Sequence, residues 1–415
     1  MDHTVAGQTA DANDPLQATR DRFCVPKDLV YLDGNSLGPL PLGVADRVND
    51  VITRQWGHSL IRGWNDHDWL DLPLRVGDRI GRLIGATPGS VVVADSTSIN
   101  VAKVVAAAVR MRPDRSVVLS DSGNFPTDLY MAQGVLRAMN SEVQLRVVAP
   151  EDVEGVLTGP DASAIAAMLL TEVDYRTGRM HDMAALTERA HQAGAIAIWD
   201  MAHSAGAVPV DLAGADADFA VGCTYKYLNC GPGSPAFVYV APRHAHDTDP
   251  LLSGWMGHES PFAFDLDYQP VEGVGRMRVG TPPILGLAAL DAALDVWDGL
   301  DMAAVRTKSI ALCERFIAGV EKRCANHDLE LVSPRDPQCR GSQVSFRHPQ
   351  GYAVVQALIA DGVIGDFRTP DVMRFGFCPL YLRHVDVDTA VAALAAILDG
   401  RTWDRPAFMT RAAVT

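Results

Sequence analysis

Short apolar runs recur along the first two thirds of the chain and are separated by stretches with helical periodicity. Six of the runs are continuous, which is typical of strands buried on both faces: Val91–Ala94, Val117–Leu119, Met168–Leu170, Ile196–Trp199, Phe219–Val221 and Phe237–Val240. A helix is predicted between two of them, over Met183–Gln192, with Gly194 as the signal that ends it. Buried strands that alternate with helices predict a mostly parallel sheet covered on both faces, an α/β fold.

The pattern changes after about residue 275. Thr281-Pro-Pro begins a long helical stretch toward Gly299, and a second helix is predicted over about 303–322. Two further strands and a helix follow, at Gln343–Phe346, Val372–Phe377 and Tyr352–Ala360. Few and scattered strands beside long helices predict a smaller α+β domain.

The first 70 residues differ from both of these regions. Residues 1 to about 30 are expected to form an arm, and a turn-rich motif at Tyr31–Pro41 precedes an amphipathic helix with Val44, Val48, Ile52 and Trp56 on one face. We therefore predict three parts. They are an arm and helix joined to the small domain (1–70), a large α/β domain (71–275) and the small α+β domain (276–415).

Composition and charge exclude several classes of protein. A formal charge of −15 argues against binding to nucleic acid or to an anionic membrane, because both need basic patches. The first 14 residues are polar and acidic, so no signal peptide is expected, and the apolar runs are too short to span a membrane. Seven scattered cysteines with no Cys-x-x-Cys pair fit a reducing compartment. A soluble cytoplasmic protein is predicted.

Polar residues gather just past the ends of the predicted strands. The five clusters are Asp95–Ser98, Asp121–Asp128, Thr171–Glu172, Asp200 and Thr224–Lys226. Ligands of open α/β sheets bind outside the carboxyl ends of the strands, so these clusters are expected to meet in one crevice.

Lys226 is the most informative residue of these clusters. It follows an apolar strand, is flanked by two tyrosines and precedes a glycine-rich turn, so burial favours its neutral amine, a nucleophile toward aldehydes. Asp200 ends the preceding strand, 26 residues earlier, where a carboxylate faces a ligand's ring nitrogen. Together they predict pyridoxal phosphate (PLP), held as a Schiff base by Lys226 and paired with Asp200 at its ring nitrogen. Taken alone, Asp200 also suits the cap of a helix that begins near Met201.

Other residues of the clusters suit the same ligand, although each has an ordinary alternative. Thr97 and Ser98 precede a helix over Ile99–Met111 and suit either a phosphate or a plain helix cap. Tyr225 and Phe125 suit contacts with the cofactor or with the core, and His203 suits a cap or the site. Arg374 lies in an apolar strand, where it needs a partner such as Asp366 or Asp371, or else clamps a substrate carboxylate. Residues Gly254–Glu259 have the wrong spacing for a metal motif, so no metal is predicted.

Several segments closely resemble kynureninase, a family within the fold-type I PLP enzymes. They are Tyr31–Gly38, Asn124–Asp128, Trp199–Ala207, Gly222–Asn229, Gly254–Trp255, Gly280–Thr281 and Met373–Phe377. The resemblance runs from about residue 20 to the C-terminus. It implies an aspartate aminotransferase-like fold and a homodimer with active sites at the subunit interface. It also implies hydrolytic cleavage of L-kynurenine to anthranilate and L-alanine in tryptophan degradation.

The resemblance also implies a role for each matching residue. Lys226 would carry the cofactor, Asp200 and His203 would lie on its ring side, and Phe125 would stack on the ring. Thr97, Ser98, Asp128 and Thr171 would complete the cofactor shell, while Tyr225 and Trp255 would hold the phosphate. Thr281 would reach in from the neighbouring subunit. Arg374, with Ser36 beside it, would bind the substrate carboxylate, and Trp64 and Gly280 would border the substrate's aromatic ring. Lys226 and Tyr225 would carry protons.

Two alternatives and one question of specificity stay open at this point. Cys339 lies 113 residues after Lys226, where a cysteine desulfurase would carry its reactive cysteine, and an aminotransferase would share the same cofactor anchors. A non-catalytic cofactor-binding protein is a third class, although no DNA-binding domain is attached. Trp64 and Thr281 resemble enzymes that prefer kynurenine to 3-hydroxykynurenine, which is the substrate specificity expected here.

Overall fold

A seven-stranded sheet forms the centre of the computed structural model, which describes residues 3–140 and 142–411. Its strands run in the order β2 (Val91–Val93), β8 (Phe237–Val240), β7 (Phe219–Gly222), β6 (Ile196–Asp200), β5 (Ile165–Thr171), β3 (Val117–Asp121) and β4 (Gln144–Val148). All neighbours from β7 to β4 pair in parallel, whereas β8 is antiparallel to both of its neighbours. The predicted mostly parallel sheet is confirmed, and β4 is a strand that the sequence pattern did not indicate.

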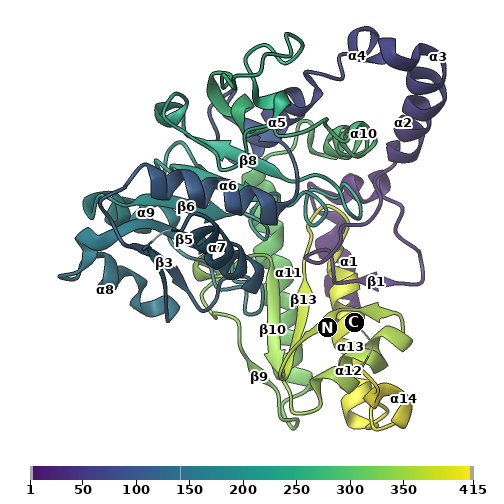
Figure 1. Ribbon diagram of the computed structural model, residues 1–415. Coiled ribbons are helices and arrows are strands. Elements are labelled where there is room, and N and C mark those ends of the chain that lie inside the picture. The colour runs from purple at the N-terminus through teal and green to yellow at the C-terminus, as the bar shows by residue number, and fades with distance from the viewer. Residues whose placement is uncertain (1–2, 141, 412–415) are drawn as a thin grey trace.

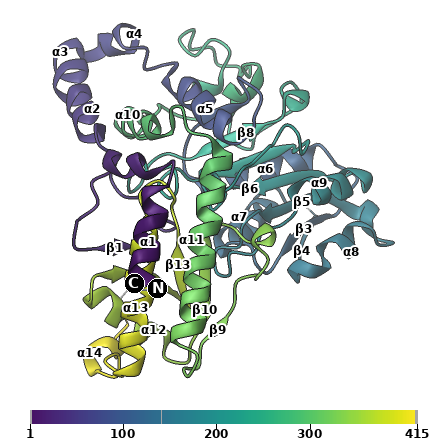
Figure 2. The same ribbon diagram turned by 180° about the vertical axis from the view of Figure 1, so that it is seen from behind.

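Helices cover both faces of this sheet (Figures 1 and 2). On one face, α6 (Thr97–Arg110) and α7 (Pro126–Ala138) pack on the side chains of Ile196 and Ile198. On the other face, α9 (Met183–Gln192) packs on β6, α5 (Leu72–Leu83) packs on β2, and both share a core with Ala197 and Trp199. Successive side chains of a strand point to opposite faces, so β6 contributes to two cores at once and is apolar from Ile196 to Trp199, before it ends at Asp200.

A second, antiparallel sheet lies in the C-terminal region, in the order β12 (Asp366–Arg368), β13 (Val372–Gly376), β10 (Gln343–Arg347) and β9 (Glu330–Leu331). It packs with α11 (Met302–Arg323), α12 (Gly351–Ala360) and α13 (His384–Asp399). The predicted elements of this region are confirmed to within a few residues. The long stretch expected after Thr281 is shorter, with α10 at Ile284–Ala293 and a 3-10 turn at Leu294–Trp297.

The N-terminal segment is joined to the C-terminal region. The helix α1 (His3–Ala12) lies beside α13 (Figure 2), and β1 (Val30–Tyr31) pairs in parallel with β11 (Val363–Ile364). The carboxylate of Asp11 accepts hydrogen bonds from the backbone N–H groups of His384 and Val385, which are unpaired donors at the start of α13. Residues of the first segment thus complete a helix near the other end of the chain, while domain boundaries near 70 and 275 stay a prediction.

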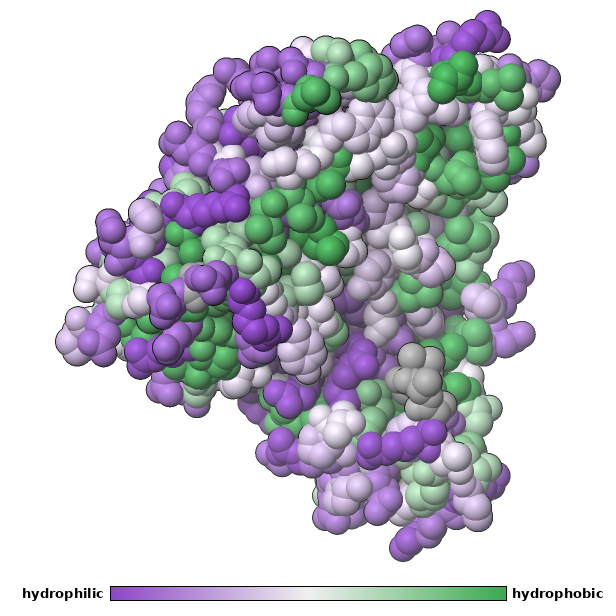
Figure 3. Space-filling view, in the orientation of Figure 1, coloured by the Kyte–Doolittle hydropathy of each residue, from purple (hydrophilic) through white to green (hydrophobic). Residues whose placement is uncertain are grey.

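The amphipathic helix predicted from Val44 differs from expectation. It begins as α2 (Val44–Asp50), continues as a π-helical turn (Val51–Trp56) and is followed by the short helices α3 (Gly57–Ser59) and α4 (Gly63–Asp66). Val44 is buried and Val48 packs on the core, but Ile52 and Trp56 are 40% and 56% exposed, so the second half of the predicted apolar face is not covered within one chain. Apolar side chains gather over this projecting corner (Figure 3), which also carries exposed Leu60 and Ile61.

The remaining helices are α8 (Val153–Leu157) and α14 (Pro406–Met409). Within the described part of the chain, no helix is both long enough and apolar enough to cross a membrane.

Candidate active site

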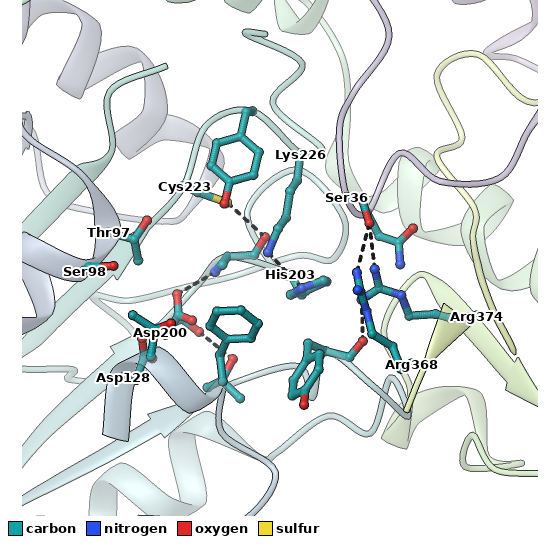
Figure 4. A pocket seen from close by; sticks show the side chains of 17 residues that line it. Ser36, Thr97, Ser98, Asp128, Asp200, His203, Cys223, Lys226, Arg368 and Arg374 are labelled. Carbon is teal, nitrogen blue, oxygen red and sulfur yellow. Dashed lines mark hydrogen bonds between the residues drawn. The ribbon is translucent and has the colours of Figure 1, made fainter. Parts of the chain in front are cut away.

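One pocket lies at the carboxyl ends of β5, β6 and β7 and is closed on its other side by the small antiparallel sheet. It brings together eleven of the predicted residues: Ser36, Thr97, Ser98, Phe125, Asp128, Thr171, Asp200, His203, Tyr225, Lys226 and Arg374. Figure 4 shows that charge is separated within it. The acidic residues Asp128 and Asp200 lie at one end, and arginines lie at the other, with Lys226 and His203 between them.

Lys226 follows β7 directly and projects into the middle of the pocket. Its Nζ lies 2.9 Å from Nε2 of His203, a buried side chain from the turn after β6. Burial and the positive charge of Lys226 lower the pKa of His203 well below its usual value, so the imidazole is neutral. The chain has five lysines, of which Lys103 and Lys308 are buried in ion pairs with Asp95 and Asp14. Lys226 is the lysine that lines this pocket.

Two buried carboxyl groups face each other on the acidic side. Burial and the neighbouring charge of Asp200 raise the pKa of Asp128 well above its usual value. Burial also raises the pKa of Asp200, and the positive charge of Lys226 offsets this only in part. Asp200 accepts a hydrogen bond from the backbone N–H of Ala202 at 2.9 Å, whereas Oδ2 of Asp128 is buried with no hydrogen-bond partner among the described residues. The pair therefore lacks a positively charged donor.

Two helices begin at the pocket. Thr97 and Ser98 form the first turn of α6, and its cap residue Ser96 accepts a hydrogen bond from the backbone N–H of Ile99. Phe125 precedes α7, which carries Asp128 in its first turn. Unpaired N–H groups and the helix dipole make such a terminus suitable for a phosphate.

Aromatic side chains form the walls of the pocket. Phe125 is half exposed and packs edge-on against Tyr175, with ring centroids 5.1 Å apart. The ring of Tyr225 lies near Nζ of Lys226, at 5.8 Å from its centroid. Cys223 and burial together raise the pKa of the Tyr225 hydroxyl, so it stays protonated and remains a hydrogen-bond donor at neutral pH.

Arg374 stands at the basic end, on β13. Its guanidinium is bound by Asp366, which lies directly opposite on β12, and it also donates to Oγ of Ser36 at 2.7 Å. Of the two partners considered from the sequence, Asp366 is therefore the one in place, while Asp371 pairs with Arg347. Arg374 is paired with Asp366 and also lines the pocket. An ion pair within the chain and a contact with a substrate carboxylate are therefore both possible for this arginine.

Four predicted residues are not brought into this pocket. Trp64 packs edge-on against Trp69, and Trp255 packs against Phe262 and is 41% exposed. Gly280 and Thr281 are exposed and lie at a separate small hollow beside Asp95. Within one chain, therefore, these four residues do not line the pocket that holds the other predicted site residues.

Six pocket residues were not singled out from the sequence: Asn35, Thr127, Tyr175, Ala202, Cys223 and Arg368. Arg368 carried a usable signal. It stands two residues after Asp366, and residues at i and i+2 of a strand share a face, so the strand that brings Asp366 to Arg374 also brings Arg368.

The residues present fit PLP. The Asp128–Asp200 pair lacks a cationic donor, which a protonated pyridine nitrogen supplies. The N-terminus of α6 offers N–H groups for a phosphate, and the Lys226 amine suits an aldehyde.

Behind the pocket lies another buried carboxyl group, on Glu172. This residue follows Thr171 at the end of β5, and its Oε2 has no hydrogen-bond partner among the described residues. Burial raises the pKa of Glu172 from 4.5 to about 7. The neutral acid is therefore the stable form in the folded protein over most of the acidic range.

Comparisons with known proteins agree with this geometry. Residues 305–394 match the family model for the kynureninase C-terminal domain. The chain is 52% identical over 410 residues to the kynureninase of Burkholderia pseudomallei (strain 1106a), and the match covers 98% of each.

Solved structures of PLP enzymes share the fold. The apo cysteine desulfurase from Thermococcus onnurineus NA1 aligns with a TM-score of 0.77 at 18% identity, over 92% of this chain and 98% of that one. A C-DES mutant with glycine covalently linked to its PLP cofactor aligns with a TM-score of 0.73 at 18% identity, over 91% and 98%. The predicted aspartate aminotransferase-like, fold-type I architecture is confirmed. Cys339, the residue on which the desulfurase alternative depended, is exposed and does not line the pocket.

Replacing Glu172 by glutamine is expected to change how stability depends on pH. Wild-type Glu172 ionises near pH 4.5 when unfolded and near pH 7 when folded, so the folded state binds more protons between these values. Stability of the wild type therefore falls as pH rises through this window, by about 3 kcal/mol from this group. The free energy of unfolding is measured with urea at pH 5 and at pH 8. Relative to the wild type, Glu172→Gln should be more stable at pH 8 than at pH 5. Exposed Glu188 on α9 offers the control Glu188→Gln, and an equal pH response of both variants would contradict the expectation.

Proposed function

Since the chain belongs to the kynureninase family, we propose that it cleaves the Cβ–Cγ bond of L-kynurenine by hydrolysis, releasing anthranilate and L-alanine. The observation that carries this proposal is 52% identity to a kynureninase over 98% of both chains. The enzyme is a PLP-dependent hydrolase acting on a carbon–carbon bond, and its place is in tryptophan degradation. Free cysteines throughout the chain support a cytoplasmic location.

When bound, PLP supplies a protonated aromatic ring that withdraws electrons from the substrate's Cα. Lys226 would hold the cofactor through its Nζ, and its free amine would take the proton from Cα. The neutral imidazole of His203, 2.9 Å from Nζ, accepts a hydrogen bond from the lysine without adding a competing positive charge.

Asp200 and Asp128 keep the proton on the ring nitrogen. Two buried carboxyl groups side by side resist double ionisation, and a protonated ring nitrogen held by them would favour the charged state of at least one. Thr171, on the strand next to Asp200, and Phe125, on the opposite wall, fix the position of the ring.

A phosphate group is bound by Thr97 and Ser98 in the first turn of α6. The Tyr225 hydroxyl, which stays protonated, donates to the same group and carries a proton during the reaction. Trp255, exposed in one chain, completes the phosphate contacts from a neighbouring subunit.

Arg374 and Ser36 bind the substrate's α-carboxylate at the basic end of the pocket. The substrate's aromatic ring is bordered by Trp64, Gly280 and Thr281. With these residues the enzyme prefers L-kynurenine to 3-hydroxy-L-kynurenine as its substrate.

The active enzyme is a homodimer with shared sites. Trp64, Trp255, Gly280 and Thr281 lie outside the pocket of their own chain, and the projecting corner at α2–α4 exposes apolar side chains at Ile52, Trp56, Leu60 and Ile61. Apolar surface of this kind is covered in an assembly. A second copy of the chain would both cover it and deliver the missing residues.

Lys226→Ala tests the proposed activity. Without the amine, we expect loss of the visible absorbance of the lysine-bound cofactor and a fall in anthranilate production by about 10³-fold or more. Anthranilate fluorescence measures the reaction, and absorbance of the purified protein measures the cofactor. Exposed Lys27 provides the control Lys27→Ala, which should keep both signals. Full turnover by Lys226→Ala would exclude the mechanism, and an inactive wild type would exclude the function.

Turnover of the two candidate substrates tests specificity. We expect a higher kcat/KM for L-kynurenine than for 3-hydroxy-L-kynurenine, because Trp64 and Thr281 offer no large polar group for the ring hydroxyl. Rates are measured from the fluorescence of the two aminobenzoate products over a range of substrate concentrations. Equal values, or a preference for the hydroxylated substrate, would reject this assignment.

Mixed dimers test the sharing of sites. Thr281→Arg places a large cation where the partner's pocket is proposed to bind substrate, and Lys226→Ala removes the amine within its own chain. In a hybrid, one site carries both changes and the other carries neither. Mixing the two inactive variants should therefore restore about a quarter of wild-type activity. Mass spectrometry of tagged chains shows whether hybrids form. Hybrids that form but stay inactive would reject the proposal that Thr281 contributes to the site of the other chain.

A further inference from the structure

The basic end of the pocket contains two arginines that share one carboxylate. Arg368 donates through Nη2 to Oδ2 of Asp366 at 2.6 Å, and Arg374 binds both oxygens of the same carboxylate. Figure 4 shows the two guanidinium groups lying together below Ser36. This arrangement follows from the hairpin of β12 and β13, which places Asp366 and Arg368 on the face that carries Arg374.

Arg374 has few donors left for a substrate. A guanidinium carries five N–H groups. Nε and one Nη2 donor bind Asp366, the second Nη2 donor binds Ser36, and Nη1 donates to the backbone oxygen of Tyr175 at 2.6 Å. One N–H on Nη1 remains. A bidentate clamp on a second carboxylate would require Arg374 to give up Ser36 or Asp366.

Arg368 is in the opposite condition. Its Nη2 is used by Asp366 and, at 3.3 Å, by Ser36, but Nε is buried without a hydrogen-bond partner among the described residues. Within the same described part of the chain, Nη1 has no partner either. The side chain is 35% exposed, compared with 1% for Arg374, and it lines the pocket. Because Nε is buried, the donors that Arg368 can offer to a ligand are the two N–H groups of Nη1, whereas Arg374 keeps one.

The charge balance points the same way. Burial alone would raise the pKa of Asp366, but Arg374 and Arg368 outweigh burial and hold it below its usual value, so this carboxylate stays ionised. Burial and the charge of Asp366 raise the pKa of nearby Asp33 to about 7, so Asp33 is only partly ionised at neutral pH. Arg368 and Arg374 are thus both positively charged, and Asp366 is the one carboxylate that is fully ionised beside them. One positive charge is left without a counter-ion, which a substrate carboxylate would supply.

We propose that Arg368 is a substrate-binding residue that supplies free N–H donors to the α-carboxylate of the amino-acid substrate, while Arg374, held by Asp366 and Ser36, supplies its positive charge and at most one donor. This inference rests on the proposed function, since it names the group of that substrate which this end of the pocket recognises. Asp366 acts through the arginines, as the counter-ion that sets their separation.

The experiment compares ligands with and without the carboxylate. L-Kynurenine and its decarboxylated analogue kynuramine are titrated into holoenzyme, and binding is followed through the cofactor's absorbance, independently of bond cleavage. Arg368→Gln should weaken L-kynurenine binding and raise its KM about 10- to 100-fold, because charge-assisted hydrogen bonds are lost. Binding of kynuramine should change less than about twofold, because it lacks the group that the arginine contacts. Arg368→Lys, which keeps the charge without the fork, should fall between.

Arg347→Gln is the matched control, since Arg347 lies on the adjoining β10 and pairs with surface Glu330 and Asp371. It should bind both ligands as the wild type does. Equal weakening of L-kynurenine and kynuramine by Arg368→Gln, or no weakening of either, would overturn the inference. Failure of the wild type to release anthranilate would reject the proposed function instead, and the binding comparison would still decide the role of Arg368.

Discussion

Two buried carboxyl groups that cannot both ionise govern this site. Asp128 and Asp200 come from different elements, a helix start and a strand end, and the fold holds them together away from water. Isolated negative charge in such a place is unstable, so the pair keeps a proton unless a positive partner is bound. A protonated ring nitrogen meets that requirement, and Lys226 and the starts of α6 and α7 are arranged around the same ligand. The charges of the site therefore favour a cofactor that carries a protonated ring nitrogen.

The large sheet and the place of the pocket could be predicted from the sequence, because the strands of parallel α/β sheets have a characteristic apolar pattern and bind ligands at their carboxyl ends. Strands buried on both faces are continuous apolar runs, so β6 and β7 were visible directly, and their ends locate a crevice. The edge strand β4 was missed because one edge is open to water and its sequence, Gln144–Val148, mixes polar and apolar residues. The apolar face expected from Val44 to Trp56 is covered only at its start, where Val44 is buried and Val48 packs on the core, while Ile52 and Trp56 are exposed.

The two ends of the pocket differ in how far sequence could describe them. The cofactor end consists of local motifs, each a strand followed by its own polar turn. The substrate end depends on strand register, since Asp366 faces Arg374, eight residues later, only through the pairing of β12 with β13. Register of that kind is set by the hairpin, and without it the sequence left open whether Arg374 pairs with Asp366, pairs with Asp371 or clamps a substrate carboxylate. With it, the clamp is already closed on Asp366, and Arg368 becomes the side chain with donors to spare.

The pairing of β1 with β11 has a consequence for how the protein is made. Val30 must wait for Val363 to be synthesised, a separation of more than three hundred residues, whereas β5, β6 and β7 follow one another closely. Contacts of such high sequence separation form late. On the ribosome, the parallel sheet with Lys226 emerges whole before Arg374 exists. The nascent chain would therefore acquire its cofactor end first, and only the finished chain could acquire the end that selects an amino acid.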